Sequence, residues 1–300
     1  MFNNFIFNKS RYQHYIYLLL ISLFAFYINK FSGNNGIVPL DSFQHFDTSI
    51  LILKDIYPIR DYWMTTGFFI NFIQSVFFYV FGLNWQTYVL HASFFNIIIS
   101  CSSYLFFNSL KIDLKYCFFY WICIATLFYP TSGTPLIYFH SSFFSIISIY
   151  LFIIAYLNKS SLSSFLIPFF MVIGFLCAQI PSAYINLLII LSFTIIFRKE
   201  RKLFHYFILG SVVAFLFFLI FILITKIEFY DFYFQHILFS LNVGLSRLLS
   251  EGSSFSKFSD ITFDRVFFDF KFIYIFLLPL IFLAIKKTFT NDRIEKHHNL

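Results

Sequence analysis

The chain has 300 residues, of which 59% are hydrophobic, 25% are aromatic and only 12% are charged. Soluble domains have an apolar share nearer one half, so this composition excludes an ordinary soluble domain and indicates a membrane protein. The formal net charge of +7 does not indicate a nucleic-acid partner. The basic residues lie in short polar stretches beside apolar runs, where the positive-inside rule places them in membrane proteins.

Eight apolar runs are candidates to cross the ~30 Å hydrocarbon core as helices. They cover residues 12–29, 66–82, 86–108, 141–157, 163–178, 182–197, 203–225 and 270–287. The first run follows Lys9 and Arg11 but lacks a small-residue cleavage site, so we expect an uncleaved span. We predict an all-α membrane protein with about eight transmembrane helices, a polytopic domain over residues 1–288 and a cytoplasmic polar tail over residues 289–300.

The charge bias predicts an orientation for these spans. Residues 198–202 read R-K-E-R-K, carry a net charge of +3 and mark the cytoplasmic side, together with the basic N-terminus and tail. The long polar segments 31–66 and 226–271 have net charges of −2 and −1 and belong outside. Both termini are therefore expected in the cytoplasm.

A ninth apolar run, 116–129, has 14 residues and reaches only about 21 Å as a helix. Residues 31–66 and 198–202 are predicted on opposite sides of the membrane, so an odd number of spans must connect them. If the run 116–129 is counted as a span, the number is even. We therefore predict a short helix that enters and leaves on the outer side, with Lys111–Lys115 outside. The same topology places 130–139 and 179–184 near the first outer segment, where protein or water must cover non-helical backbone.

The first outer segment concentrates chemistry that the rest of the chain lacks. Within 21 residues it holds an arginine, a histidine and four acids: Asp41, His45, Asp47, Asp55, Arg60 and Asp61. Between 42 and 57, apolar side chains recur every three or four residues at Phe43, Phe46, Ile50, Leu53 and Tyr57. This spacing predicts a helix with one apolar face that lies in the membrane interface.

The order of motifs in this segment resembles GT-C-type polytopic membrane glycosyltransferases, the superfamily that includes protein mannosyltransferases and aminoarabinose transferases. The resemblance covers about 45 residues and rests on Asp41, His45, Asp47, the Y-P-I-R-D element at 57–61, Gly67 and Phe81-Gly82. It implies an enzyme that uses a polyprenyl-phosphate sugar. Relatives generally have more spans, and often a soluble domain, so a truncated relative is a further expectation.

The resemblance implies an inverting transfer in which a carboxylate removes the proton of the acceptor hydroxyl while the lipid phosphate leaves. Asp41 and Asp47 are the expected catalytic residues. A divalent metal ion is a possible cofactor, with Asp41 and His45 as its ligands. The expected substrate- and phosphate-binding residues are His45, Arg60, Asp61, Gln179, Arg247 and Lys271.

Each of these residues also has a structural interpretation. Asp41-Ser-Phe-Gln44 resembles a capping box that begins a helix, and Arg60 with Asp61 forms the ion pair of a turn after Pro58. Gln179 lies in a tight turn at Pro181, and Ala178 stands where relatives carry a lysine. Basic residues at span ends also reach the interface without a catalytic role.

The predicted function is transfer of a sugar from a polyprenyl-phosphate donor to a lipid or glycan acceptor hydroxyl, on the outer face of the cytoplasmic membrane. One alternative is a transporter or flippase of lipid-linked saccharides, which needs ionisable groups within its spans; another is a non-catalytic subunit of a cell-envelope glycan assembly. The spans carry few such groups. We interpret the remaining histidines as structural, as we do the four cysteines in apolar runs: His14, His91, His140, His205, His236, Cys101, Cys117, Cys123 and Cys177.

Overall fold

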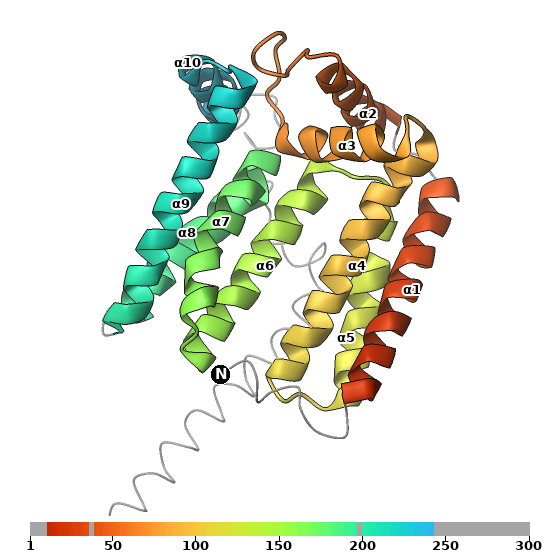
Figure 1. Cartoon of the computed structure of the whole chain (residues 1–300), viewed down its shortest axis with the longest axis vertical. Helices are drawn as coiled ribbons and strands as arrows, with labels where there is room; N and C mark the ends of the chain where they lie inside the picture. Colours follow the sequence, from red (N-terminus) through yellow and green to blue (C-terminus); the bar gives the residue numbers. More distant parts are fainter. Residues whose placement is uncertain (1–10, 36–38, 197–199, 243–300) are drawn as a thin grey trace, which may run out of the picture. The chain divides into compact units, whose positions relative to one another are not determined.

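The structure is a computed structural model that describes residues 11–35, 39–196 and 200–242 (Figure 1). Within these ranges the chain is helical, with an isolated bridge between Pro58 and Tyr62 and no strand. The prediction of an all-α protein is confirmed for this part. One compact unit ends at Leu238 and contains every helix named below.

The helices follow one another through short connections, apart from the loop between α2 and α3. In chain order they are α1 (Arg11–Asn35), α2 (Pro39–Leu53), α3 (Phe69–Phe81), α4 (Trp85–Ser109), α5 (Leu114–Leu127), η2 (Tyr129–Thr131), α6 (Ile137–Asn158), α7 (Ser161–Cys177), α8 (Gln179–Ile196), α9 (Arg201–Thr225), α10 (Phe229–Phe232) and η4 (Tyr233–Leu238).

Five helices in the described residues are long and apolar enough to cross a membrane: α1, α4, α6, α8 and α9. They support a membrane protein, but the predicted count of about eight spans is not confirmed. The predicted span 66–82 is a helix of only 13 residues, α3, which reaches about 20 Å and lies across one end of the longer helices (Figure 1). The predicted run 270–287 lies outside the described residues.

The short helix α5 runs lengthwise beside α1 and does not return to the side on which it began. At its start, Phe118 packs against Tyr17, with ring centroids 4.9 Å apart. Just beyond its end, the carbonyl of Pro130 accepts a hydrogen bond from Ser32, fifteen residues farther along α1 than Tyr17. The prediction that 116–129 enters and leaves on one side is therefore wrong. The element that lies across one end is α3.

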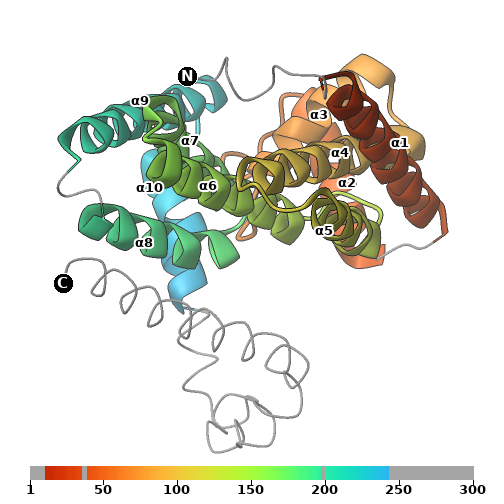
Figure 2. The same ribbon diagram turned by 90° about the horizontal axis from the view of Figure 1, so that it is seen from below.

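Apart from α2, α3 and the short elements η2, α10 and η4, the helices pack as two neighbouring groups. One group contains α1, α4 and α5, and the other contains α6 to α9 (Figure 2). A core of Phe95, Phe143, Phe144 and Tyr129 joins α4, α6 and η2. Close approach of α9 to α7 depends on Gly210, because an added Cβ would lie 2.0 Å from the carbonyl oxygen of Phe165. Small residues permit such contacts between membrane helices.

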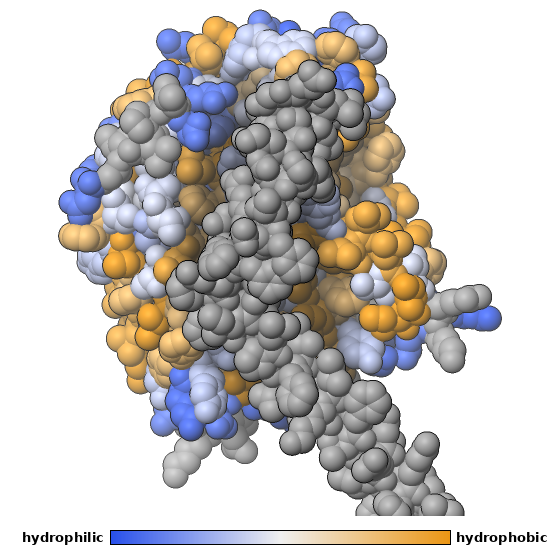
Figure 3. Space-filling model, turned by 180° about the vertical axis from the view of Figure 1, so that it is seen from behind, coloured by the Kyte–Doolittle hydropathy of each residue, from blue (hydrophilic) through white to orange (hydrophobic). Residues whose placement is uncertain are grey.

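Large apolar side chains remain exposed along the helices. Examples are Leu19 on α1, Ile195 on α8 and Leu223 on α9, with exposed fractions of 61%, 75% and 74%. Hydrophobic residues predominate between the ends of the described part, and hydrophilic residues gather towards those ends (Figure 3). Continuous apolar surface of this kind is typical of helices that face lipid.

Candidate functional site

The helix α2 carries most of the predicted site residues and begins earlier than the sequence pattern predicts. It starts at Pro39 and ends at Leu53. Proline suits the first helical position, since its fixed φ fits the helix and its missing N–H is not needed there. Asp41 therefore lies within the first turn, so the predicted capping box with Asp41 as N-cap is wrong.

The side of α2 that packs on the protein is mainly polar. Its buried residues are Ser42, His45, Thr48, Ser49 and Ile52. Of the predicted apolar face, Phe43 and Leu53 are 47% and 41% exposed. Phe46 and Ile50 are half-buried, and the Phe46 ring packs on the rings of Phe78 and Tyr88. A packed side that is mainly polar, with exposed apolar side chains at Phe43 and Leu53, differs from a helix on a water-soluble protein, which turns its apolar side inward.

Three hydroxyl groups fix α2 against the segment that precedes α6. The hydroxyl groups of Ser42 and Thr134 lie 3.0 Å apart. The Tyr88 hydroxyl of α4 donates to the carbonyl of Ser42 at 2.9 Å and to that of Pro135 at 3.2 Å. The prediction that 130–139 lies near the first outer segment is confirmed by these contacts.

His45 is buried beneath α2 and is held by an amide of α3. Its exposed fraction is 3%, and its Nδ1 lies 3.0 Å from Oδ1 of the fully buried Asn71. Burial lowers the pKa of His45 to about 4, against the opposing effects of the Asn71 hydrogen bond and the Asp41 charge. His45 is therefore neutral near pH 7, with Nδ1–H donated to Asn71 and a lone pair on Nε2.

Asp41 and Asp47 are both exposed on α2, but they face different directions. Six residues at 100° each place the two carboxylates about 120° apart around the helix, as the sequence predicts. Asp41 lies one turn before His45 and acts on it electrostatically. Within the described residues no group of three or more His, Cys, Asp or Glu is arranged to hold a metal ion, so the pair of Asp41 and His45 stays a prediction as a metal site.

Sequence reasoning missed two histidines that lie beyond His45. His91 of α4 and His140 of α6 are fully buried, and their Nε2 atoms lie 3.0 Å apart. Nδ1 of His91 lies 2.6 Å from Oε1 of Gln74 on α3. His45 is close enough to act electrostatically on His140.

The sequence contains one signal for this buried polar cluster. Asn71 and Gln74 are three residues apart in the apolar run F-I-N-F-I-Q-S-V-F, so they share one face of the helix. Both amides are buried. Because a buried amide needs hydrogen-bond partners, two amides on one apolar helix face predict polar side chains on the helices opposite.

Arg60 and Asp61 hold the loop between α2 and α3 through hydrogen bonds to each other and to the backbone. The Nε of Arg60 donates to both carboxylate oxygens of Asp61 at 3.0 Å, and Oδ2 of Asp61 accepts from the backbone N–H of Tyr57 at 2.7 Å. The Arg60 side chain also lies over the Tyr57 ring, 4.4 Å from its centroid. Hydrogen bonding to Arg60 lowers the pKa of the Asp61 carboxyl below its ordinary value.

The other guanidinium donors of Arg60 reach backbone carbonyls. One donates to Asp55, and another donates to Thr225 at the end of α9, at 3.3 Å. The same loop is tied to η4, where Gln235 donates to the carbonyl of Ile59 at 3.2 Å and accepts from the N–H of Met64 at 3.0 Å. The structural interpretation of Arg60 and Asp61 fits this geometry.

Gln179 joins the junction of α7 and α8 to the same loop. Its Nε2 donates to the carbonyl of Thr65 at 3.3 Å and to that of His236 at 2.7 Å, and lies 2.9 Å from Nδ1 of His236. The neighbouring Ala178, which stands where relatives have a lysine, is only 1% exposed. The junction therefore lies near the first outer segment, as predicted. Arg247 and Lys271 lie outside the described residues.

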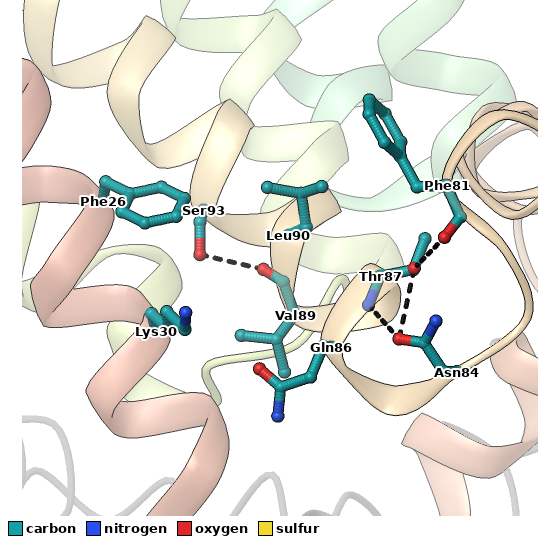
Figure 4. Close-up of a pocket in the computed structure, with 9 residues that line it drawn as sticks. All are labelled: Phe26, Lys30, Phe81, Asn84, Gln86, Thr87, Val89, Leu90 and Ser93. Atoms are coloured by element: carbon teal, nitrogen blue, oxygen red, sulfur yellow. Dashed lines mark hydrogen bonds between the residues drawn. The ribbon is translucent and has the colours of Figure 1, made fainter.

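A separate pocket of about 310 Å³ opens between α1 and the start of α4 (Figure 4). Lys30 and Phe26 line it from α1, and Asn84 and Thr87 line it from α4 and the turn before it. Oδ1 of Asn84 accepts from the N–H of Thr87 at 2.9 Å, which caps α4. None of the site residues predicted from the sequence lines this pocket.

In comparisons with models of protein families, with curated proteins and with solved structures, no match to this chain was found.

Proposed function

We propose that the protein is a GT-C-type membrane glycosyltransferase that transfers a sugar from a polyprenyl-phosphate donor to an acceptor hydroxyl. One observation supports this best: α2 exposes the carboxylate of Asp41 in its first turn and the apolar side chains of Phe43 and Leu53 along its outer side. A helix of this kind lies in the membrane interface. There the phosphate of a lipid donor meets a water-exposed base.

In this proposal Asp41 takes the proton of the acceptor hydroxyl, with Asp47 as the alternative base. His45 is neutral near pH 7 and carries a free Nε2 lone pair, so it suits hydrogen bonding to substrate or metal binding better than charge neutralisation. Arg60, Asp61 and Gln179 position the segment, because their polar groups contact the protein's own backbone. Arg247 and Lys271 have the role of neutralising the negative charge on the departing phosphate, as predicted from the sequence.

The path of the chain supports the proposed orientation in the cytoplasmic membrane, with α2 outward and 198–202 inward. Lys159, which follows α6, pairs with Glu200 of this basic segment at 2.8 Å. His140, near the start of α6, lies instead by the α2 end. Five helices, α4 to α8, connect α3 to 197–199. If each of them crosses, the number is odd, as opposite sides require.

A transporter of lipid-linked saccharides is the second candidate function, and one observation favours it. Ionisable groups within spans were expected to be almost absent, but His91 and His140 meet between α4 and α6, two of the candidate spans. Ionisable groups inside a membrane domain commonly mark a substrate or proton path.

One experiment separates the two functions. Purified protein is placed in liposomes with a labelled polyprenyl-phosphate sugar, and both label transfer and donor movement between leaflets are measured. Release of lipid phosphate together with a labelled glycoside or free sugar supports the transferase. Movement of intact donor between the leaflets, without cleavage, supports the transporter and contradicts the transferase.

A further inference from the structure

We propose that His91 and His140 form a buried proton-binding site, in which one additional proton is held between their two Nε2 atoms. The site lies between α4 and α6, two of the helices long enough to cross a membrane. Both side chains are fully buried. The inference does not depend on the proposed glycosyltransferase activity.

The argument begins with the hydrogen bonds at the outer edges of the two rings. Nδ1 of His91 faces Oε1 of Gln74 at 2.6 Å. Nδ1 of His140 faces the carbonyl oxygen of Leu136 at 3.3 Å. Both oxygens are acceptors, so each Nδ1 must carry a proton to make a hydrogen bond.

The two Nε2 atoms then create a conflict. They lie 3.0 Å apart, which is the length of a nitrogen–nitrogen hydrogen bond. Two neutral rings carry two N–H protons between them, and both are already used at Nδ1. With both protons held at Nδ1, the two Nε2 lone pairs would face each other inside the protein. One additional proton between them completes all three hydrogen bonds.

Gln74 provides the matching neutral state. When the Gln74 amide turns by half a rotation, its NH2 group donates to Nδ1 of His91. His91 then carries its proton on Nε2 and donates it to Nε2 of His140, so the pair needs no additional proton. In the present orientation the Gln74 Nε2 is buried without a partner; in the turned orientation the oxygen takes that place. Uptake of a proton is therefore coupled to rotation of one amide.

The surroundings suit a shared cation better than a metal ion. The ring of Phe77 stacks on His91 at 4.8 Å, and Phe95 lies 4.6 Å from the His140 ring; aromatic faces attract cations. Within the described residues no third ligand completes a metal site with the pair. A metal with only two imidazole ligands would lack the set of three or four that protein sites usually provide.

Two titratable side chains face the pair from neighbouring elements, and a third lies behind one of them. His45 approaches from α2, and the Tyr129 ring from η2 lies 5.2 Å from His140. Cys177 of α7 belongs to the same packed cluster as Tyr129. Asp41 is the carboxylate that acts on His45.

The test is nitrogen NMR of the full-length protein, labelled with ¹⁵N-histidine and held in lipid bilayers, recorded across a pH titration. We expect one pair of imidazoles to show ¹⁵N–¹⁵N coupling across a hydrogen bond and to titrate as a single unit. The coupled signals should vanish in both His91→Gln and His140→Gln. They should remain in His205→Gln, which removes an exposed histidine of α9.

A second variant keeps both rings in place. Gln74→Glu supplies a carboxylate, which in its ionised form only accepts and adds a negative charge beside His91. We therefore expect the pair to hold its proton at least tenfold more tightly, a rise of one pH unit or more in the midpoint. Three results would overturn the proposal: separate titration of the two rings, no coupling in the wild-type spectrum at any pH, or displacement of both Nε2 signals by added Zn²⁺ or Mn²⁺.

Discussion

The backbone of Gly67 lies directly against the carbonyl group of Cys177: a Cβ added at Gly67 would come within 1.4 Å of that oxygen. This contact joins the end of the first outer segment to the junction of α7 and α8. The hydrogen bond from Gln179 to the carbonyl of Thr65 lies beside it. Gly67 matched the family pattern as the residue that opens a span, but its structural role is this close approach.

Replacing Gly67 with alanine should destabilise the protein because the backbone at Cys177 cannot yield as a flexible side chain can. Overpacking of this kind costs about 1–3 kcal/mol, which thermal unfolding in detergent would register as a lower midpoint. Gly82→Ala is the control: its φ of +86° strains an alanine, but the nearest atom to the new Cβ is 3.7 Å away. A Gly67→Ala midpoint equal to that of the wild type would contradict the contact.

Asp61→Asn should destabilise the protein at neutral pH. Its carboxylate accepts from both Arg60 and the backbone of Tyr57, and its pKa is lowered mainly by the hydrogen bond from Arg60. A lowered pKa gives stability that is present above the ordinary value of 3.8 and is lost as the pH falls below it. The difference between wild type and variant should therefore shrink on acidification below about pH 4.

The matched control for this variant is Asp55→Asn. The Asp55 carboxylate is 81% exposed and lies 3.9 Å from the Arg60 guanidinium, so its removal should have the smaller effect. Unfolding midpoints of both variants, measured from pH 7 to pH 3, check the prediction. A pH-independent difference for Asp61→Asn would show that the carboxylate charge has no part in fixing the loop.

Acid should destabilise the wild type through His45. Its folded-state pKa of about 4 lies below the ordinary 6.5, so the unfolded chain binds the additional proton first, and stability falls as the pH drops from 6.5 towards 4. A lowering of the pKa from 6.5 to about 4 is worth on the order of 3 kcal/mol. His45→Gln should lose this part of the slope, and His205→Gln should keep it.

His236 contributes a slope of the same sign, since burial also lowers its pKa to about 4. The His45 variant should therefore flatten the pH dependence only in part. Unfolding midpoints measured between pH 7 and pH 5 in one detergent check this. A slope in His45→Gln as steep as in the wild type would show that His45 accepts its proton without loss of the α2 contact to Asn71.

Periodicity and composition were enough to predict the helices, because apolar runs near 20 residues in length signal them directly. They were not enough to decide which short run lies across one end. The run 66–82 is as apolar as a span, yet it forms only 13 helical residues, since Gly67 and Phe68 belong to the packed loop. The run 116–129 is shorter than a span, but α5 traverses beside α1.

For the candidate site too, some features could be predicted from the sequence and others could not. The local sequence placed Asp41, His45 and Asp47 on one helix and correctly turned Asp47 away from Asp41. It could not pair His45 with Asn71, or His91 with His140, because these contacts join residues 26 and 49 positions apart. Such pairs depend on how helices pack, and a single sequence does not record helix packing.

The proposed base, Asp41, can be separated from its helical role by one substitution. Asp41 lies in the first turn of α2 and is exposed. Asn is similar in size to Asp and forfeits only the modest interaction of a charge with the helix N-terminus, about 0.3–1 kcal/mol. Asp41→Asn should therefore insert and unfold much like the wild type. An amide cannot take a proton, so transfer from a labelled lipid-linked donor should fall by roughly 10²–10⁴-fold.

Asp47→Asn is the matched control, since Asp47 is an exposed carboxylate on the same helix that faces about 120° away from Asp41. With Asp41 as the base, Asp47→Asn should retain most of the transfer. Loss of transfer in Asp47→Asn alone would move the base to Asp47. Normal transfer in both variants would end the proposed mechanism, because no other carboxylate of α2 reaches the interface: Pro39–Leu53 contains only these two acids.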